Sequence, residues 1–223
     1  MRWSRSARVA MGDLRRVTPF SREFGFDRGS PVDRRYVEAF LQRHAADVRG
    51  RVLEIKDRAY TERFGGQRVD TSDVLDVDAS NPVATLVDDL TTGARLPADA
   101  FDCIVLTQTL HLVFDVHAAA RTLHRILKPG GVLLLTVPGI TPIPRAEASS
   151  WHWSFSDRSA DRLFRSTFEG GDVDVRTHGN VLVATAFLYG LAEDELRDAE
   201  LDASDPDYPV IVTVRAVKAS AAR

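Results

Sequence analysis

The feature that most constrains the fold of this chain is a continuous apolar run, FDCIVLTQTL, from Phe101 to Leu110. A sheet with one wet face alternates apolar and polar residues, whereas a strand covered by helices on both faces is apolar throughout. A second apolar run spans residues 132–137, after a helix-like segment that begins at Asp115. Two buried strands joined by a helix predict an α/β fold with a mostly parallel sheet.

Strand-like and helix-like segments alternate along the rest of the chain. Expected strands span residues 51–56, 69–77, 84–90 and 173–177, and a last one follows Pro209. Almost no residues remain for a helix between the second and third strands, which is unusual for a parallel pair. A short turn or helix is expected at residues 60–64. Longer helices are expected after N-cap residues, and the last of these helices extends to about Glu195. The expected N-caps are Ser30, Asp115, Ser156 and Asn180.

Composition excludes several classes of protein. A formal net charge of −3 gives no sign of a nucleic-acid surface. Cys103 is the only cysteine, so no disulfide framework forms within the chain, and a reducing cytoplasm fits. No apolar run is long enough to span a bilayer. We therefore expect a cytoplasmic protein with no membrane span and no nucleic-acid partner.

Residues 101–139 carry a specific series of features. An apolar strand behind Phe-Asp ends in Gln-Thr, and a helix, the sequence LKPGG and another apolar strand follow. This series resembles the class I S-adenosylmethionine-dependent methyltransferases, and the resemblance extends over residues 21–218. It implies a doubly wound, Rossmann-like sheet of seven strands whose last strand is antiparallel, with S-adenosylmethionine as cofactor.

The basic N-terminus, which lacks the apolar core of a signal peptide, and the resemblance together imply an organisation of the chain. Residues 1–20 are expected to form a loosely ordered basic leader, and residues 21–223 a single methyltransferase-like domain. Within the domain, residues 21–50 would form an N-terminal cap region. The cofactor half would span 51–140 and the substrate-side half 141–223.

The first motif departs from the family pattern. Where the family has Glu-x-Gly-x-Gly, this chain has Glu54-Ile55-Lys56-Asp57-Arg58. The cofactor carries no phosphate, so the loop need not cradle an anion with bare backbone, and side chains can bind the cofactor instead. We favour a working variant loop over the alternative, a catalytically silent methyltransferase-like protein that supports a partner. A dinucleotide oxidoreductase is disfavoured because no Gly-x-Gly-x-x-Gly follows the first strand.

Ligands of open α/β sheets bind at the carboxyl ends of the strands, which here carry many polar residues. By resemblance, Asp76 or Asp78 would bind the ribose, since a carboxylate accepts two hydrogen bonds from a diol. These acids, with Asp73, also suit a metal ion, although ribose contacts are the favoured interpretation and no metal is expected. The resemblance also implies that Asp89 contacts the adenine. The other expected cofactor contacts are Glu54, Ile55, Lys56, Asp57, Leu90, Gln108, Thr109 and Leu110.

The substrate side is less defined. Removal of a proton from an acceptor hydroxyl requires a base, and His111 and His152 are placed for it, although either side chain also suits simple packing. Trp151 and Trp153 form either an aromatic platform for an acceptor or two anchors of a loop, and Tyr36 is a third candidate substrate contact. We expect O-methylation of a sugar, a glycan end or another hydroxylated small molecule. N-methylation and a homodimer remain open.

Overall fold

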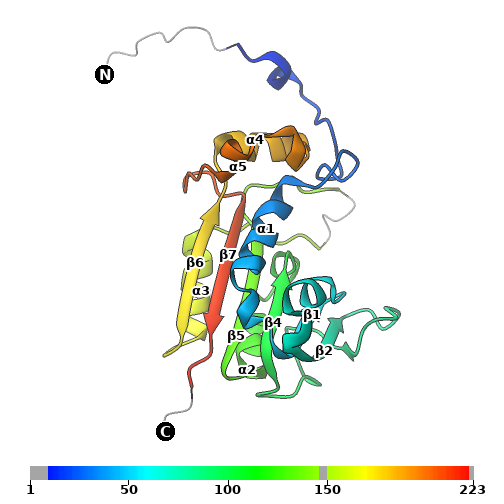
Figure 1. The fold of residues 1–223 in the computed structure, drawn as a ribbon, viewed down its shortest axis with the longest axis vertical. Coiled ribbons are helices and arrows are strands. Elements are labelled where there is room, and N and C mark those ends of the chain that lie inside the picture. Colours follow the sequence, from blue (N-terminus) through cyan, green and yellow to red (C-terminus); the bar gives the residue numbers. More distant parts are fainter. Residues whose placement is uncertain (1–9, 146–149, 221–223) are drawn as a thin grey trace.

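The computed structural model describes residues 10–145 and 150–220; the first nine residues of the predicted leader lie outside this range. The described residues form one seven-stranded sheet in the order β3-β2-β1-β4-β5-β7-β6 (Figure 1). Six strands run parallel, and β7 is antiparallel to both of its neighbours, which confirms the predicted fold. The strands are β1 Gly50–Ile55, β2 Val69–Asp76, β3 Leu86–Val87, β4 Phe101–Thr107, β5 Leu127–Pro138, β6 Asp172–His178 and β7 Ile211–Val217.

Helices cover both faces of the sheet. Helix α1, Val32–Arg43, lies on one face, and α2, Val116–Ile126, and α3, Asp157–Thr167, lie on the other (Figure 1). Side chains alternate along each strand accordingly. Val52 packs with the α1 side and Leu53 with the α2 side, so the two faces have separate cores. None of the helices in the described ranges is both long enough and apolar enough to cross a membrane.

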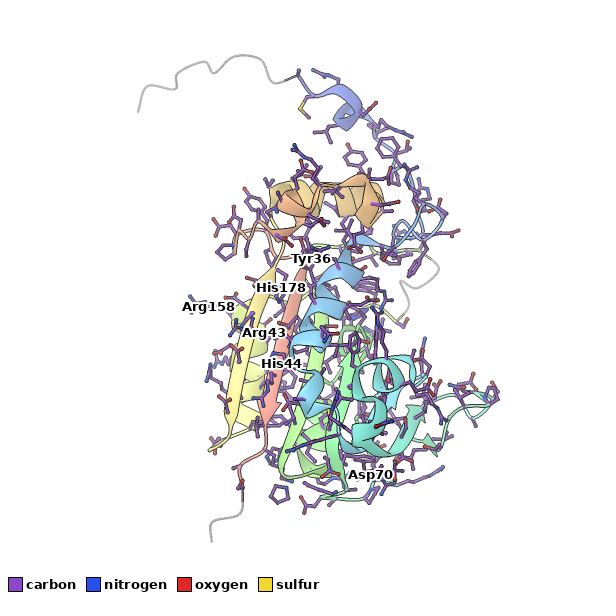
Figure 2. The ribbon with its side chains drawn as sticks, viewed as in Figure 1. Tyr36, Arg43, His44, Asp70, Arg158 and His178 are labelled. Atoms are coloured by element: carbon purple, nitrogen blue, oxygen red, sulfur yellow. The ribbon has the colours of Figure 1, made fainter. Side chains whose placement is uncertain are left out.

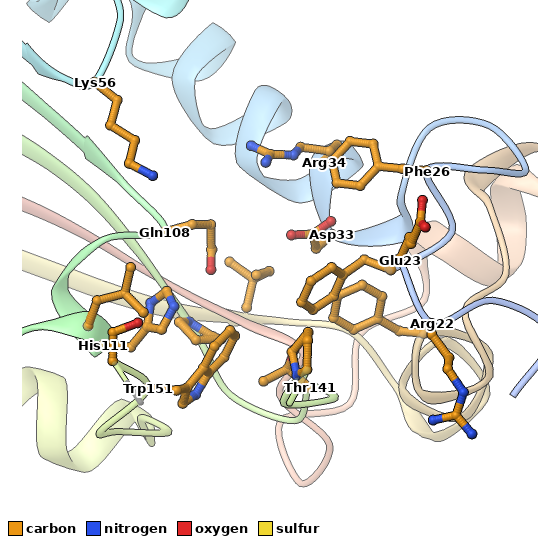
Figure 3. Close-up of a pocket in the computed structure, with 17 residues that line it drawn as sticks. Arg22, Glu23, Phe26, Asp33, Arg34, Lys56, Gln108, His111, Thr141 and Trp151 are labelled. Carbon is orange, nitrogen blue, oxygen red and sulfur yellow. The ribbon is translucent and has the colours of Figure 1, made fainter. Parts of the chain in front are cut away.

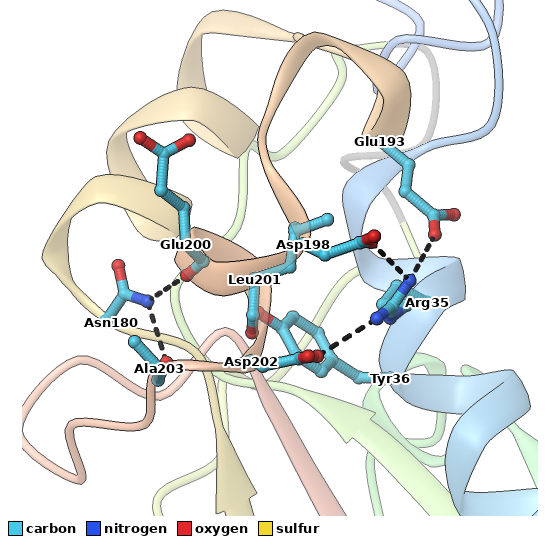
Figure 4. Close-up of polar contacts among 9 residues, drawn as sticks. All are labelled: Arg35, Tyr36, Asn180, Glu193, Asp198, Glu200, Leu201, Asp202 and Ala203. Atoms are coloured by element: carbon cyan, nitrogen blue, oxygen red, sulfur yellow. Dashed lines mark hydrogen bonds and ion pairs between the residues drawn. The ribbon is translucent and has the colours of Figure 1, made fainter.

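A small layer lies beyond the carboxyl ends of the parallel strands. It comprises residues 181–202, with the helices α4, Val181–Tyr189, and α5, Asp198–Asp202, and is called here the end cap (Figure 1). Arg35 of α1 forms ion pairs with three of its acids, as Figure 4 shows: Glu193, Asp198 and Asp202.

Tyr36 completes the attachment of α1 to the end cap. Its hydroxyl donates a hydrogen bond of 2.8 Å to the carbonyl oxygen of Leu201. Its ring stacks on His178 at the end of β6, with ring centroids 5.7 Å apart (Figure 2). The end cap is therefore fixed to both α1 and the sheet.

The N-terminal segment lies against the end cap. Phe20 and Ser21 both donate backbone hydrogen bonds to the carbonyl oxygen of Tyr189. The Tyr189 hydroxyl in turn donates to the carbonyl oxygen of Leu14. Gly190 allows this contact, because its φ is +72° and an added Cβ would lie 2.4 Å from the Ser21 carbonyl oxygen. The contacts begin within the predicted leader, and the boundary at residue 20 stays a prediction.

Several predicted element ends are corrected. Ser30 is not the N-cap of α1; Pro31 occupies that position in extended conformation and makes no side-chain cap. The third strand has two residues instead of seven, because the backbone amide of Asp88 bonds to Asp76 and the chain then turns. The helix after Asn180 ends at Tyr189, where Gly190 takes the left-handed conformation. The N-caps at Asp115, Ser156 and Asn180 are confirmed.

Candidate active site

A cavity of about 620 Å³ opens at the carboxyl ends of the central strands (Figure 3). Lys56 follows β1, Gln108 follows β4, and Pro138 ends β5, so the cavity lies where ligands bind in sheets of this type. The opposite wall comes from the N-terminal segment, the start of α1 and the segment after β5. That wall includes Arg22, Glu23, Phe24, Phe26, Asp33, Arg34, Thr141, Pro144 and Trp151.

Two strand ends at this cavity have unusual backbone geometry. Lys56 has a φ of +71° and Gln108 a φ of +45°, both in the left-handed region that favours glycine. Each such residue costs about 1–2 kcal/mol and persists only where its surroundings fix it. The Lys56 amide donates to the carbonyl oxygen of Leu75, and its carbonyl oxygen accepts 2.8 Å from the side-chain nitrogen of Asn81. A lysine thus occupies a position whose backbone conformation favours glycine.

Charged side chains line the two ends of the cavity. The Lys56 side chain extends into it at one end, and Glu23 lies at the other (Figure 3). Within the described part of the chain, the Lys56 ammonium forms no ion pair or hydrogen bond. The guanidinium of Arg34 donates 3.0 Å to the hydroxyl of Tyr60. Burial raises the pKa of Asp33, against the opposing effect of neighbouring Arg34, so this acid is only partly stabilised in its charged form.

The remaining residues of the first motif shape the loop. The buried carboxylate of Glu54 accepts the backbone amides of Tyr60 at 3.1 Å and Thr61 at 2.7 Å. Burial raises its pKa, and these two bonds act in the opposite direction. Asp57 accepts the amide of Ala59, and Ile55 packs against the core. Glu54, Ile55 and Asp57 therefore support the turn and lie outside the cavity lining, and their predicted contacts with a cofactor stay predictions.

The predicted adenosine contacts lie at the ends of β2 and β3, beside β1. Asp76 is nearly buried and fixes its own loop, since its carboxylate accepts the amide of Asp78 at 3.0 Å and the side chain of Asn81 at 2.7 Å. Asp78 and Asp89 are exposed, whereas Leu90 is buried. None of these residues lines the cavity, so the ribose and adenine assignments stay predictions. The exposed carboxylates of Asp78 and Asp89 are the more accessible ones.

His111 and Trp151 lie together on the cavity wall. Only 3% of His111 is exposed, and its ring centroid lies 4.2 Å from that of Trp151. The His111 Nδ1 and the Trp151 Nε1 are both buried and, in the ranges that the structure describes, have no hydrogen-bond partner. Burial lowers the pKa of His111 to about 4, so the imidazole is neutral at neutral pH. Phe24 stacks on Trp151, with centroids 6.4 Å apart.

The other predicted substrate residues do not line this cavity. His152 is exposed and its ring contacts Phe114 edge-on. The Trp153 indole donates 3.0 Å to the carbonyl oxygen of Val113 and lies outside. Tyr36 is buried, with its hydroxyl bonded to Leu201. The structure therefore brings only His111 and Trp151 of these candidates into the cavity.

The last two predicted cofactor contacts follow β4 and also lie outside the cavity lining. The Thr109 hydroxyl donates 2.9 Å back to the carbonyl oxygen of Thr107. Leu110 is fully buried in the core. Gln108 is thus the only member of the predicted Gln108–Leu110 group whose side chain reaches the cavity.

Sequence reasoning missed Glu23, Phe24, Asp33 and Asn81. The first three lie in residues 21–50, the N-terminal cap region that the resemblance implied, but nothing local in the sequence indicates which of its side chains reach the cavity. Asn81 lies between the second and third predicted strands, where the sequence indicates only a turn. Its bonds to both Lys56 and Asp76 depend on the packing of two neighbouring loops.

Comparison with known structures defines the class of fold. A methyltransferase dependent on S-adenosylmethionine from Archaeoglobus fulgidus superposes with a TM-score of 0.56 at 13% identity, over 83% of this chain and 94% of that one. The [4+2]-cyclase SpnF gives 0.58 at 16% identity, over 86% and 85%. Phosphoethanolamine N-methyltransferase 2 of Haemonchus contortus, in complex with S-adenosyl-L-methionine, gives 0.57 at 14%, over 83% and 53%. At these identities the likeness concerns the fold.

The sequence family is more specific. The family described as "Methyltransferase domain" matches residues 25–187, which include every cavity-lining residue except Arg22, Glu23, Phe24 and Ile211. The chain belongs to this family and is a class I, S-adenosylmethionine-dependent methyltransferase.

Curated relatives match over a shorter stretch. The ubiquinone/menaquinone biosynthesis C-methyltransferases UbiE of Enterobacter sp. (strain 638) and Escherichia coli are 42% identical over 60 residues. That stretch is 25% of this chain and 24% of each relative, so the chain spans about a quarter of the curated relatives it matches.

The cavity fits the cofactor of this family. Its volume lies within the range of about 300–1,000 Å³ that small-molecule sites occupy. The Lys56 ammonium, which has no partner among the described residues, suits an α-carboxylate, and Asp33 suits the positive groups of the same molecule. The left-handed turn at Lys56 also places the loop backbone as a glycine would. The missing glycines are therefore no obstacle to the loop conformation.

Proposed function

We propose that this enzyme transfers a methyl group to the hydroxyl of a sugar or another hydroxylated small molecule, with His111 as the base. The observation that carries the proposal is the buried, neutral imidazole of His111, whose Nδ1 has no partner among the described residues and whose ring faces the cavity. Buried polar atoms are normally hydrogen-bonded, so an unpaired one at a cavity suggests a role with a ligand.

For this transfer, the protein mainly has to position the acceptor hydroxyl and to remove its proton. S-adenosylmethionine, when bound, supplies a methyl group on a sulfonium, which is a good leaving group. The neutral imidazole of His111 takes the proton that the acceptor hydroxyl loses as its oxygen gains the methyl group. Trp151 and Phe24 limit the space around the imidazole and exclude water from it.

The cofactor would be held in a way that differs from the family pattern, by Lys56 of the first motif and by side chains at neighbouring strand ends. The Lys56 ammonium would bind the α-carboxylate, and Gln108, at the neighbouring strand end, would contact the methyl-donor side. Asp78 and Asp89 would reach the ribose and the adenine from the ends of β2 and β3. The buried thiol of Cys103, the single cysteine, supports a cytoplasmic enzyme.

The test begins with cofactor binding and then turnover. Calorimetric titration with S-adenosylmethionine and S-adenosylhomocysteine should give micromolar dissociation constants, weakened in Asp89→Ala. A panel of sugars, phenols, amines and quinols then distinguishes O-methylation from N- and C-methylation. Exclusive transfer to nitrogen or carbon would exclude the proposed acceptor class.

The variant His111→Asn tests the role of His111 as a base separately from cofactor binding. It keeps a polar side chain of similar size but cannot take up a proton. The expected result is a fall in kcat of about 10²–10⁴-fold with an unchanged dissociation constant for the cofactor. An unchanged kcat would eliminate His111 as the base.

A further inference from the structure

A second hollow lies on the outer side of the wall that carries Trp151. It has a volume of about 890 Å³, and we call it the outer groove. Its floor and rim come from the start of α2, residues 153–156 and the outer side of α3. The residues that matter for its chemistry are Phe114, Asp115, Trp153, Ser154 and Arg162.

The floor of the outer groove is a preformed aromatic surface. Phe114 is 72% exposed and Trp153 39% exposed, and their ring centroids lie 6.1 Å apart. The Trp153 Nε1–H donates to the carbonyl oxygens of Val113 and Phe114, at 3.0 and 3.2 Å. These bonds satisfy the only polar group of the indole and fix the ring, so a ligand meets an apolar face at little entropic cost. Large aromatic rings exposed together mark a binding surface.

The rim of the outer groove supplies free hydrogen-bonding groups. The Arg162 guanidinium and the Ser154 hydroxyl make no hydrogen bond or ion pair within the part of the chain that the structure describes. Asp115, the only carboxylate of the lining, accepts the amide of Ala118 as the N-cap of α2. The groove thus offers an apolar floor with donors at its edge, and the Arg162 guanidinium and the Asp115 carboxylate are its two charged groups.

We propose that the outer groove binds a neutral pyranose ring, as a second carbohydrate subsite beside the active-site cavity. A pyranose has an apolar C–H face for the Phe114 and Trp153 rings and hydroxyl groups at its edge for Arg162 and Ser154. A lipid tail would leave these two polar side chains unpaired. A nucleic acid would require several unpaired cations, and the lining contains one.

A second copy of the chain is a poorer occupant. A two-fold interface uses the same patch on both copies, so it would bring two Arg162 side chains together. Asp115 is the one carboxylate of the lining, and one of its oxygens already accepts the amide of Ala118. A neutral, hydroxylated ligand uses the rim donors and the remaining oxygen of Asp115 without bringing the two guanidinium groups together.

The outer groove and the active-site cavity share one wall. His111 lines the cavity, and its carbonyl oxygen accepts the amides of His152 at 3.0 Å and Trp153 at 3.2 Å. Along this wall Trp151 faces the cavity and Trp153 faces the groove. An acceptor of two or more linked sugars can therefore have one ring at each site. This last step rests on the proposed function, whereas sugar binding in the groove does not.

The test uses the full chain without cofactor and a panel of neutral probes: the methyl glycosides of glucose, galactose and mannose, with maltotriose and mannotriose. The protein is labelled with 5-fluorotryptophan, which reports each of the 3 tryptophans separately by fluorine NMR. The expected result is a shift of the Trp153 resonance at millimolar sugar. Phe114→Ala should weaken this binding about five- to tenfold.

Matched variants decide between the sites. Trp153→Phe keeps a ring in the groove and should retain most of the binding, whereas Trp153→Ala should lose it. Loss of binding in Trp151→Ala with no effect of Phe114→Ala would place the sugar in the cavity and overturn the proposal. Absence of binding by every probe would overturn it as well. So would a dimer, in sedimentation, that Phe114→Ala dissociates.

Turnover provides an independent measurement. If methyl transfer is found, Phe114→Ala should raise KM for trisaccharide acceptors and leave KM for monosaccharides unchanged. If no transfer to any hydroxyl is found, the proposed function fails while the fluorine NMR result still decides the groove.

Discussion

Replacing Lys56 by glycine should stabilise the fold and weaken cofactor binding at the same time. The left-handed backbone of Lys56 costs about 1–2 kcal/mol, which glycine does not incur. Glycine also makes the unfolded chain more flexible, and this lowers the stability of the folded state by about 0.4–1 kcal/mol. The net effect is a stabilisation of about 0.5 kcal/mol, or a rise in Tm of about 1–2 °C for a chain of this length.

The effect on binding has the opposite sign. A hydrogen bond between the Lys56 ammonium and a carboxylate contributes about 1.5–3 kcal/mol. Its loss corresponds to a dissociation constant for S-adenosylhomocysteine about 10- to 150-fold higher. Thermal unfolding without ligand measures the first effect, and calorimetric titration measures the second.

Lys56→Met is the matched control, because it keeps the length of the side chain and the left-handed strain but removes the charge. It should lose affinity like Lys56→Gly without the gain in Tm. If Lys56→Gly binds the cofactor as tightly as the original chain, or more tightly, then the lysine is only tolerated in the loop and the assignment of its ammonium to the carboxylate is refuted.

Three other perturbations follow from the structure. The folded-state pKa of His111, about 4, lies below its ordinary 6.5, so its contribution to stability is complete above pH 6.5 and is lost as pH falls toward 4. This loss is about 3 kcal/mol, and chemical unfolding of His111→Asn should lack that part of the pH dependence. Glu54→Ala leaves the amides of Tyr60 and Thr61 without an acceptor and should lower the free energy of unfolding by about 1–3 kcal/mol, measured by urea titration. Arg35→Ala removes three half-exposed ion pairs to the end cap and should cost about 1 kcal/mol, with a loss that shrinks at high salt.

The sequence predicted those parts of the fold that local physics determines. The apolar run in β4 required a doubly covered strand, and the N-caps at Asp115, Ser156 and Asn180 act within three residues of their own position. Ser30 failed as an N-cap because Pro31, in extended conformation, takes that position itself. Such a choice depends on how the preceding segment enters the helix.

The candidate site was less predictable because its parts meet over long sequence separations. Phe24 stacks on Trp151, which lies more than a hundred residues further along the sequence, and no local pattern predicts this contact. The segment around Trp151 and Trp153 has no regular secondary structure, so no periodicity indicates that one indole faces the cavity and the other faces the outer groove. Lys56 and Gln108 were predicted because strand ends can be located from sequence.

The loop after β1 shows how a turn can persist without glycine. The Lys56 amide and carbonyl are both bonded, to Leu75 and to Asn81, and Asn81 is held in turn by the nearly buried carboxylate of Asp76. The other end of the loop is fixed by Glu54, which binds two amides of the following turn. Because the loop is restrained at both ends, the strain at Lys56 is offset locally. This restrained loop directs the Lys56 ammonium, which is unpaired among the described residues, into the cavity.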